Sequence, residues 1–284
     1  MTPATCSASP ATERTAPETM EKQIIGRGLL AGALAGLFAF IFARIFVEPV
    51  IERAIAYEEG VGAAHEAMAG HAHGGHSHGD GGGFDRVVQA NIGMGLGVLA
   101  FSVAIAALFA VVFAVAYGRV GDVSARLLSV YVAGGMLLSL YIVPSLKYPA
   151  SPPALSLDET IRQRTLLYLF MVVLSAALLV GAVYLGRRLS DRLGAWNATL
   201  AAAGSYVVAI AVLMLILPGI HETPGPLRDD AGTIVYEGFP ADALYEFRLF
   251  SLGTQVVIYT TIALAFGAMA ARLLGEKRRE SVPL

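Results

Sequence analysis

Charged residues and cysteine are both scarce in this 284-residue chain. Only 15% of its residues are Asp, Glu, Lys or Arg, whereas soluble domains carry about 25%. Its single cysteine, Cys6, allows neither an intrachain disulfide nor a cysteine-based metal site. The net charge of −2 is uninformative about nucleic acid, but the sequence has no basic patch of the kind that nucleic-acid binding needs, so no such partner is expected. These shortages exclude an ordinary soluble domain, and a mean hydropathy of +0.63 favours a protein dissolved in the lipid bilayer.

Sequence motifs of several enzyme classes are also missing. The chain has no G-x-x-x-x-G-K-[ST] loop and no dinucleotide-binding fingerprint that opens a helix after a strand. No Ser-His-Asp arrangement can be recognised. His65-Glu66 does not complete an H-E-x-x-H zinc motif, because position 69 is Ala. We therefore expect that the protein is not an enzyme.

Long apolar stretches are what the chain has in abundance. A helix needs about 20 mostly apolar residues to cross the hydrocarbon core. Stretches that qualify are 24–47, 90–117, 126–143, 165–186, 195–217 and 249–272. None shows the alternation of a barrel strand. The sequence therefore predicts an all-α polytopic membrane protein, a bundle of about six transmembrane helices that occupies residues 24–272.

Basic residues set the expected orientation. With six spans both termini lie on one side, which then holds twelve of the twenty Lys and Arg. The other side, with loops 48–89, 144–164 and 218–248, holds fifteen of the twenty-two Asp and Glu. The positive-inside rule predicts a multi-pass plasma-membrane protein with both termini cytoplasmic. Residues 1–23 are expected to be a disordered tail, and residues 273–284 a short basic tail.

A histidine-rich tract stands out in the first outer loop, over residues 60–83. It contains His71, His73, His76 and His78, separated by small residues. Neutral imidazole binds zinc, copper, nickel and cobalt, and the surrounding glycines let the segment wrap an ion. The tract predicts a loop that captures a divalent transition metal without selecting among metals. The alternative is a low-complexity Gly/His linker with no ion.

Further candidate ligands lie where spans leave the membrane. Glu48 ends the first apolar stretch, four residues after Arg44 and just before Pro49. Arg44 and Glu48 share one helix face, and Glu52 would continue that face if Pro49 only kinks the helix. Arg44 has the alternative of snorkelling to the interface, whereas the Glu48 carboxylate is a candidate to receive an ion.

The other two long loops carry weaker signals. His221 and Glu222 follow the fifth stretch and are candidate metal ligands, or simply polar residues of a helix end. Lys147 and Arg248 lie beside the third and sixth stretches, where they either anchor the interface or shape an ion entrance.

Glycines recur every fourth residue in the first stretch, at Gly28, Gly32 and Gly36. This spacing lets another helix approach closely, so that van der Waals contacts drive packing. The motif predicts a tight helix–helix contact, either within the chain or with a partner chain.

Several segments resemble the family of probable cobalt transporter subunits called CbtA. They run in order from about residue 24 to 272 and include Phe46-Val47-Glu48-Pro49, Pro144-Ser145-Leu146-Lys147-Tyr148-Pro149-Ala150, Thr160-Ile161-Arg162-Gln163-Arg164 and Ser251-Leu252-Gly253-Thr254-Gln255. The resemblance implies an integral membrane protein that imports cobalt beside a small single-span partner, CbtB, with its own histidine-rich segment. That family is usually described with five spans rather than six.

Together these features predict a membrane subunit for uptake of cobalt or a related divalent metal. Its expected partners are the bilayer, the metal ion and a CbtB-like subunit. The metal is cargo, and no permanently bound cofactor is expected. The alternatives are a non-transporting metal-binding or assembly subunit, a metal exporter, and a membrane-embedded enzyme that acts on a lipid.

Overall fold

The computed structural model describes residues 15–69, 88–155, 158–220 and 223–275. The elements in chain order are α1 (Thr15–Phe42), η1 (Ala43–Val47), α2 (Glu48–Met68), η2 (Gln89–Gly93), α4 (Met94–Ala116), α5 (Ala125–Met136), η3 (Leu137–Ile142), α6 (Val143–Lys147), η4 (Pro153–Leu155), α7 (Asp158–Ile216), β1 (Leu227–Arg228), β2 (Ile234–Tyr236) and α8 (Ala241–Leu273). Segments η1, η2 and η3 are π-helical, and η4 is a 3₁₀ turn.

Five helical segments are long and apolar enough to cross a membrane. They are Lys22–Met68, Ala90–Ala116, Ala125–Lys147, Thr160–Ile216 and Ala241–Leu273. A helix satisfies its own backbone hydrogen bonds, which lipid cannot do. The prediction of an all-α polytopic membrane protein is therefore confirmed.

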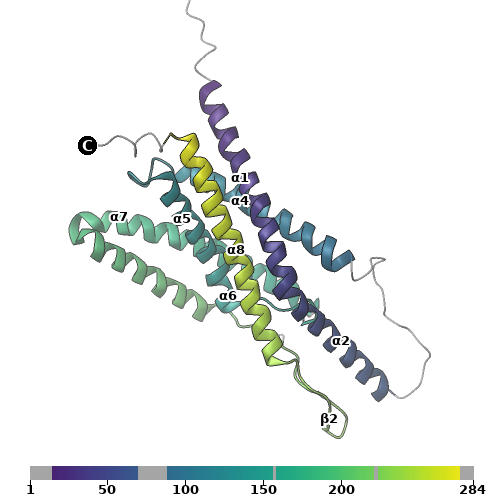
Figure 1. The fold of residues 1–284 in the computed structure, drawn as a ribbon. Helices are drawn as coiled ribbons and strands as arrows, with labels where there is room; N and C mark the ends of the chain where they lie inside the picture. Colours follow the sequence, from purple (N-terminus) through teal and green to yellow (C-terminus); the bar gives the residue numbers. More distant parts are fainter. Residues whose placement is uncertain (1–14, 70–87, 156–157, 221–222, 276–284) are drawn as a thin grey trace, which may run out of the picture. The chain divides into compact units, whose positions relative to one another are not determined.

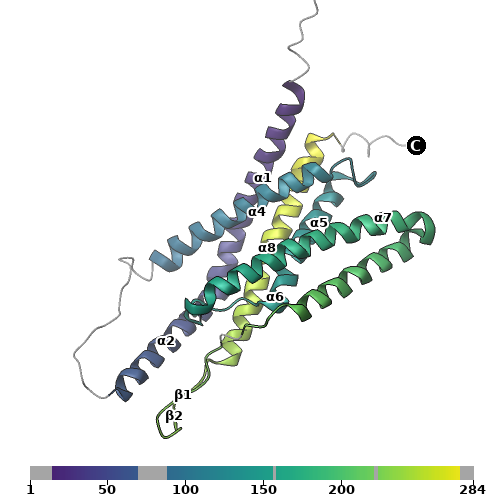
Figure 2. The same cartoon turned by 180° about the vertical axis from the view of Figure 1, so that it is seen from behind.

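The six predicted apolar stretches fall into five helices because α7 contains two of them. As a straight rod its 59 residues would reach about 88 Å, far beyond a bilayer core. The helix instead breaks at Gly194, where φ is 75° and ψ is 160°. Figures 1 and 2 both show its two arms running back alongside each other. α7 is therefore a helical hairpin with two apolar arms.

Buried contacts hold the two arms of α7 together. The hydroxyls of Ser175 and Tyr206 lie 2.8 Å apart, one on each arm. Nearer the turn, a Cβ on Gly186 would come within 3.1 Å of the Cβ of Ala202. The small residue allows close approach, and the hydroxyl pair satisfies polar groups that would otherwise face lipid.

Helix boundaries differ from those expected from hydropathy. Helix α1 begins at Thr15, within the segment 1–23 that we expected to be disordered. After the first apolar stretch the helix continues to Met68, although we expected a loop from residue 48. Hydropathy marks the apolar segment, whereas a helix that is already formed can extend beyond it, because each further residue adds one backbone hydrogen bond without a new nucleation cost.

Two of the π-helical segments end two residues before a proline. Pro49 lacks an N–H and its ring clashes with the carbonyl four residues earlier, so the regular pattern cannot pass through it. In η1 the N–H of Glu48 bonds to the carbonyl of Ala43, five residues back. Val143 bonds to Leu138 in the same way ahead of Pro144. The helix thus continues past each proline through one widened turn.

The chain divides into two compact units. Unit 1 consists of Met1–Leu37, Val98–Ala133 and Ile258–Leu284, and unit 2 of Phe38–Gly97 and Gly134–Val257. The core of unit 1 includes the buried rings of Phe109, Phe113 and Phe266. The ring centroid of Phe266 lies 5.1 Å from that of Phe109 and 4.8 Å from that of Phe113. Edge-to-face packing of this kind adds to the hydrophobic gain.

The predicted glycine contact lies inside unit 1, between α1 and α4. A Cβ on Gly28 would lie 2.7 Å from the Cβ of Ala110, and one on Gly32 would lie 2.7 Å from the Cβ of Ala106. At Gly36 it would meet the Cα of Leu99 at 2.9 Å. The prediction of a tight helix contact is confirmed, and its partner is a helix of the same chain.

Unit 2 contains two apolar clusters. The first gathers side chains from η1, α2, η4 and the start of α8, and the second gathers side chains from η3, α6 and both arms of α7. The short strands β1 and β2 pair antiparallel, and the ring of Tyr236 packs against Tyr57 with centroids 5.6 Å apart. The strand pair is thereby attached to α2.

Candidate functional site

Of the seven predicted metal ligands, only Glu48 lies among the described residues. His71, His73, His76, His78, His221 and Glu222 lie outside them. Within the described part of the chain, no group of three or more His, Cys, Asp or Glu side chains is placed to hold a metal ion.

Glu48 is a buried carboxylate within the first candidate span. It is the first residue of α2, and its side chain is only 1% exposed. Its neighbours Val47 and Val50 are buried in the first apolar cluster of unit 2. Ionisable side chains are costly inside a membrane span, and they mark ion pathways in many transporters. Its burial makes Glu48 a functional candidate on physical grounds.

Arg44 and Asn91 connect two π-helical segments of unit 2. Nε of Arg44 in η1 donates a hydrogen bond to Oδ1 of Asn91 in η2 at 3.1 Å. Sequence reasoning left Arg44 between a pairing with Glu48 and snorkelling, and the structure gives it a protein acceptor on another segment. π-helical turns occur frequently at functional sites. Segment η1 ends just before the buried Glu48, and η2 ends just before α4. The bond therefore joins two irregular helical stretches.

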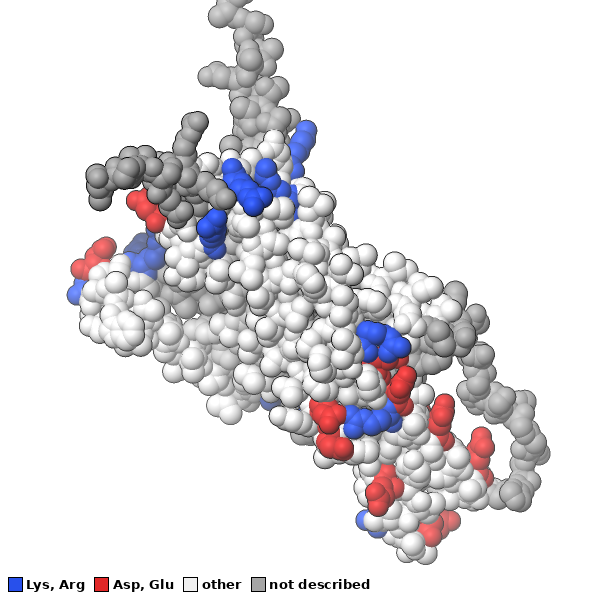
Figure 3. All heavy atoms as spheres, in the orientation of Figure 1, with Lys and Arg blue, Asp and Glu red and all other residues white. Residues whose placement is uncertain are grey.

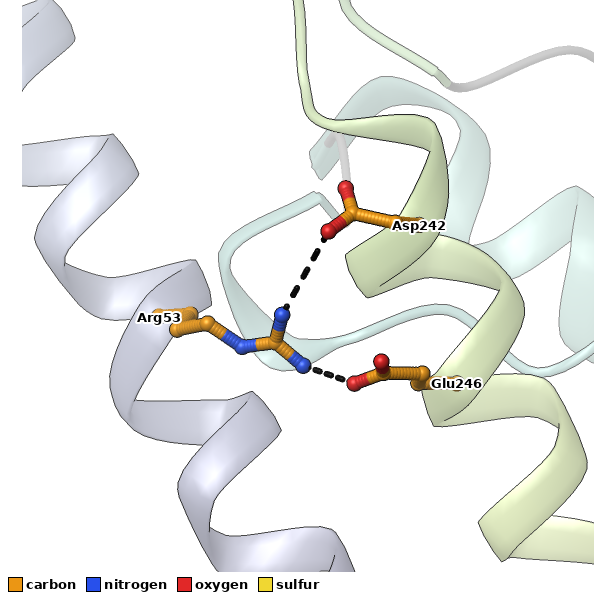
Figure 4. A network of polar contacts seen from close by, with 3 residues as sticks. All are labelled: Arg53, Asp242 and Glu246. Atoms are coloured by element: carbon orange, nitrogen blue, oxygen red, sulfur yellow. Dashed lines mark hydrogen bonds and ion pairs between the residues drawn. The ribbon is translucent and has the colours of Figure 1, made fainter.

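A second arginine connects α2 with α8 at the surface of unit 2. Arg53 lies between Asp242 and Glu246, with Nη1 3.6 Å from Oδ2 of Asp242 and an ion pair to Glu246 (Figure 4). All three side chains are more than a third exposed. Such pairs contribute about 0–1 kcal/mol. The two carboxylates are therefore engaged by a guanidinium, an arrangement that sequence reasoning missed.

Acidic side chains gather over α2 and the β1–β2 pair, as Figure 3 shows. The exposed ones in this region of unit 2 are Glu52, Glu58, Glu59, Glu66, Asp230, Glu237 and Asp242. A surface of this sign attracts cations. This acidic surface agrees with the excess of acidic residues counted in the loops.

A basic cavity of about 340 Å³ lies elsewhere in unit 2. Three cationic residues line it, Lys147 at the end of α6, Arg164 near the start of α7 and Arg248 near the start of α8. The sequence singled out Lys147 and Arg248 separately, and the structure brings them to one cavity together with Arg164. Thr223, which follows Glu222, is also in the lining.

Both arginines hold the Pro-rich segment between α6 and η4. Nη2 of Arg164 donates to the carbonyl of Pro149 and, at 3.3 Å, to Oγ of Ser151. Nε of Arg248 donates to the carbonyl of Ala150 at 3.3 Å. These bonds satisfy backbone oxygens of an irregular segment, which lipid could not do. The role of Arg164 was missed, although it belongs to a stretch that carries the family resemblance.

Tyr148, at the start of the Pro-rich segment, connects it to the chain that follows α7. It is 3% exposed, and its hydroxyl donates to the carbonyl of Pro218 at 2.8 Å. Burial raises the pKa of the Tyr148 phenol above its ordinary value, which keeps the phenol protonated as a donor. The cavity is thus framed by a fixed backbone rather than by a free loop.

The model of the family described as "Probable cobalt transporter subunit (CbtA)" matches residues 21–271. Comparison with curated proteins and with solved structures gives no match. The matched segment contains the whole candidate transmembrane region apart from the last residues of α8. The chain therefore belongs to the CbtA family of probable cobalt transporter subunits.

Proposed function

We propose that the protein is the membrane subunit that takes up cobalt, or a related divalent transition metal, across the plasma membrane. Membership of the CbtA family supports a cobalt transporter subunit. The burial of Glu48 inside a candidate span is the observation that carries the transport role, because ionisable side chains buried within spans mark ion pathways in many transporters. Both termini would lie in the cytoplasm.

Capture is assigned to the histidine tract. His71, His73, His76 and His78 follow α2, whose exposed face carries several carboxylates. The acidic surface raises the local concentration of cations, and imidazoles then bind transition metals in preference to calcium or magnesium. The tract would increase uptake at low metal concentration without setting selectivity.

Passage inward is assigned to the region of Glu48. A single buried carboxylate supplies negative charge and oxygen donors, which suit a partly hydrated divalent ion. The widened turn η1 immediately before Glu48 leaves carbonyl groups outside the regular helical pattern. His221 and Glu222 would add donors at the entrance. The metal is cargo throughout.

Cellular metal content tests this proposal. A metal-starved host would express the chain with and without a CbtB-like single-span partner, and cobalt, nickel, zinc and copper would be measured by mass spectrometry. We expect a gain in cobalt that is reduced when the four tract histidines are changed to Ala. Lower cobalt than in the empty host would indicate export.

Reconstitution into liposomes separates transport from assembly. We expect cobalt to enter vesicles that contain the purified chain together with the partner. If the protein is inserted and folded but no metal enters the vesicles, either with or without the partner, the subunit is non-transporting and the proposal is wrong.

A further inference from the structure

The face that α1 buries within unit 1 consists almost entirely of small residues. Between Lys22 and Leu37 the buried residues are Ile24, Gly28, Ala31, Gly32, Ala35 and Gly36. The large side chains of this stretch are instead 40–65% exposed at Leu29, Leu30, Leu34 and Leu37. Large side chains that interlock are what fix the height of one packed helix against another. From Gly28 to Gly36 the buried face of α1 has no such side chain.

Small residues of α4 follow the same four-residue spacing as the glycines of α1 and extend one turn further. They are Ser102, Ala106, Ala110 and Ala114. The glycines meet the first three of them in antiparallel order, with Gly28 near Ala110, Gly32 near Ala106 and Gly36 near Ser102. The fourth, Ala114, is exposed. Three glycines therefore face a row of four small residues, which offers two equivalent positions.

Ser102 is the polar member of this row, and its hydroxyl is not satisfied. The residue is 0% exposed, and a Cβ on Gly36 would lie 3.4 Å from the Cβ of Ser102. Oγ of Ser102 has no hydrogen-bond partner in the part of the chain that the structure describes. A buried hydroxyl without a partner is unfavourable. The observed position of α1 thus keeps a polar group where no acceptor reaches it.

We infer that α1 has a second stable position, displaced by one helical turn along α4. There the contacts would be Gly28 with Ala114, Gly32 with Ala110 and Gly36 with Ala106. Each glycine would again meet an alanine, and Ser102 would leave the glycine contact. The displacement is four residues, or about 6 Å. One-turn shifts of this kind between packed elements are an established form of conformational switching.

The displacement would be passed on toward the buried carboxylate. α1 continues through η1 into α2 within one helical segment, Lys22–Met68, and Glu48 lies on that segment. Movement of α1 along its axis would therefore move the helix that carries Glu48. This consequence rests on the proposed function, whereas the existence of two positions of α1 does not.

A distance measurement between spin labels on α1 and α4 tests the inference. The full-length protein with Cys6→Ser would carry labels at Leu37→Cys and Val115→Cys, two positions that are more than half exposed. In lipid nanodiscs without cobalt, pulsed electron paramagnetic resonance should give two distance populations about 5–6 Å apart. The shorter distance belongs to the second position, because Gly28 then lies closer to the end of α4 that carries Val115.

A label pair on α4 and α8 is the control for the distance measurement. The exposed positions Phe101 and Leu264 would be labelled, and they should give one distance. The rings of Phe109, Phe113 and Phe266 interlock these two helices. A single distance for the α1–α4 pair as well would overturn the inference. Cobalt is not needed, so the outcome is separate from that of the uptake experiments.

Two substitutions assign the shorter distance to the second position. Ala114→Leu should reduce that population at least tenfold, because the added side chain would clash with Gly28 only there. Ala114 is exposed in the observed position, so the longer distance and Tm should not change. Ser102→Ala should lower the ratio of the shorter to the longer distance by roughly tenfold, since it removes the unsatisfied hydroxyl from the observed position.

Val112→Leu is the matched control for Ala114→Leu. Val112 is exposed and, at 100° per residue, lies on the side of α4 away from Ala110. It should leave both distance populations as they are in the parent. A shorter distance that persists in Ala114→Leu, or that is lost equally in Val112→Leu, would overturn the inference.

Discussion

Arg44 and Asn91 are joined by a hydrogen bond of 3.1 Å between Nε and Oδ1, and this bond links η1 to η2. Arg44 and Asn91 are 47 residues apart in sequence. A wide helical turn has weaker internal support than a regular one. The side-chain bond therefore helps to fix the geometry of the stretch that ends at the buried Glu48.

Asn91→Ala should destabilise unit 2 by about 0.5–1.5 kcal/mol, because it removes the acceptor of Arg44. Denaturant or thermal unfolding in detergent measures the change. Thr199→Ala is a suitable control, since Thr199 is exposed and its hydroxyl bonds to the carbonyl of Ala195 in its own arm of α7. Equal decreases in the free energy of unfolding of the two variants would show that the Arg44–Asn91 bond stabilises the protein no more than an exposed bond within one helix.

Glu48→Gln should abolish most cobalt accumulation while the protein still reaches the membrane. The change removes the charge of a side chain that is 1% exposed but keeps its size. Asp191→Asn, which changes an exposed carboxylate of α7 outside the acidic surface, should leave accumulation close to that of the parent. If both variants accumulate cobalt normally, the carboxylate at position 48 has no role in passage.

Gly32→Ala should destabilise unit 1 by about 1–3 kcal/mol, as expected for overpacking. The added Cβ would lie 2.7 Å from the Cβ of Ala106 and 2.9 Å from the Cα of Val103, so α1 and α4 must separate. Gly26→Ala is the matched control on α1, with no atom within 4 Å of the new Cβ. Gly26→Ala should be neutral or stabilising by up to about 1 kcal/mol, from helix propensity. The same loss in both variants would contradict the packing argument.

Gly194→Ala should destabilise the α7 hairpin by about 1–2 kcal/mol. At φ 75° and ψ 160° an L side chain is strained, although there is open space for it. Gly204→Ala, within the second arm and also with no atom within 4 Å, should not destabilise. Comparing the Tm values of the two variants separates backbone strain from loss of glycine flexibility. A Gly194→Ala protein as stable as the parent would argue against the strained turn.

Hydropathy identified the apolar segments correctly but not their ends or their grouping into helices. Stretches 165–186 and 195–217 became two arms of one hairpin, because the break at Gly194 depends on backbone dihedrals that composition does not reveal. The π-helical turns before Pro49 and Pro144 were likewise unexpected. A proline in the sequence indicates that the helix is irregular nearby, whereas the form of the irregular turn depends on the residues that pack around it.

Sequence alone determined the membrane class, the family and the tight contact at Gly28, Gly32 and Gly36, because each depends on residue types at short range. Tertiary structure decided that the glycine contact is made with α4 of the same chain. It also decided that Lys147, Arg164 and Arg248 line one cavity, although each alone resembles an ordinary interfacial anchor. Such groupings depend on how distant helices pack, and packing joins residues whose separation in sequence carries no signal of their contact.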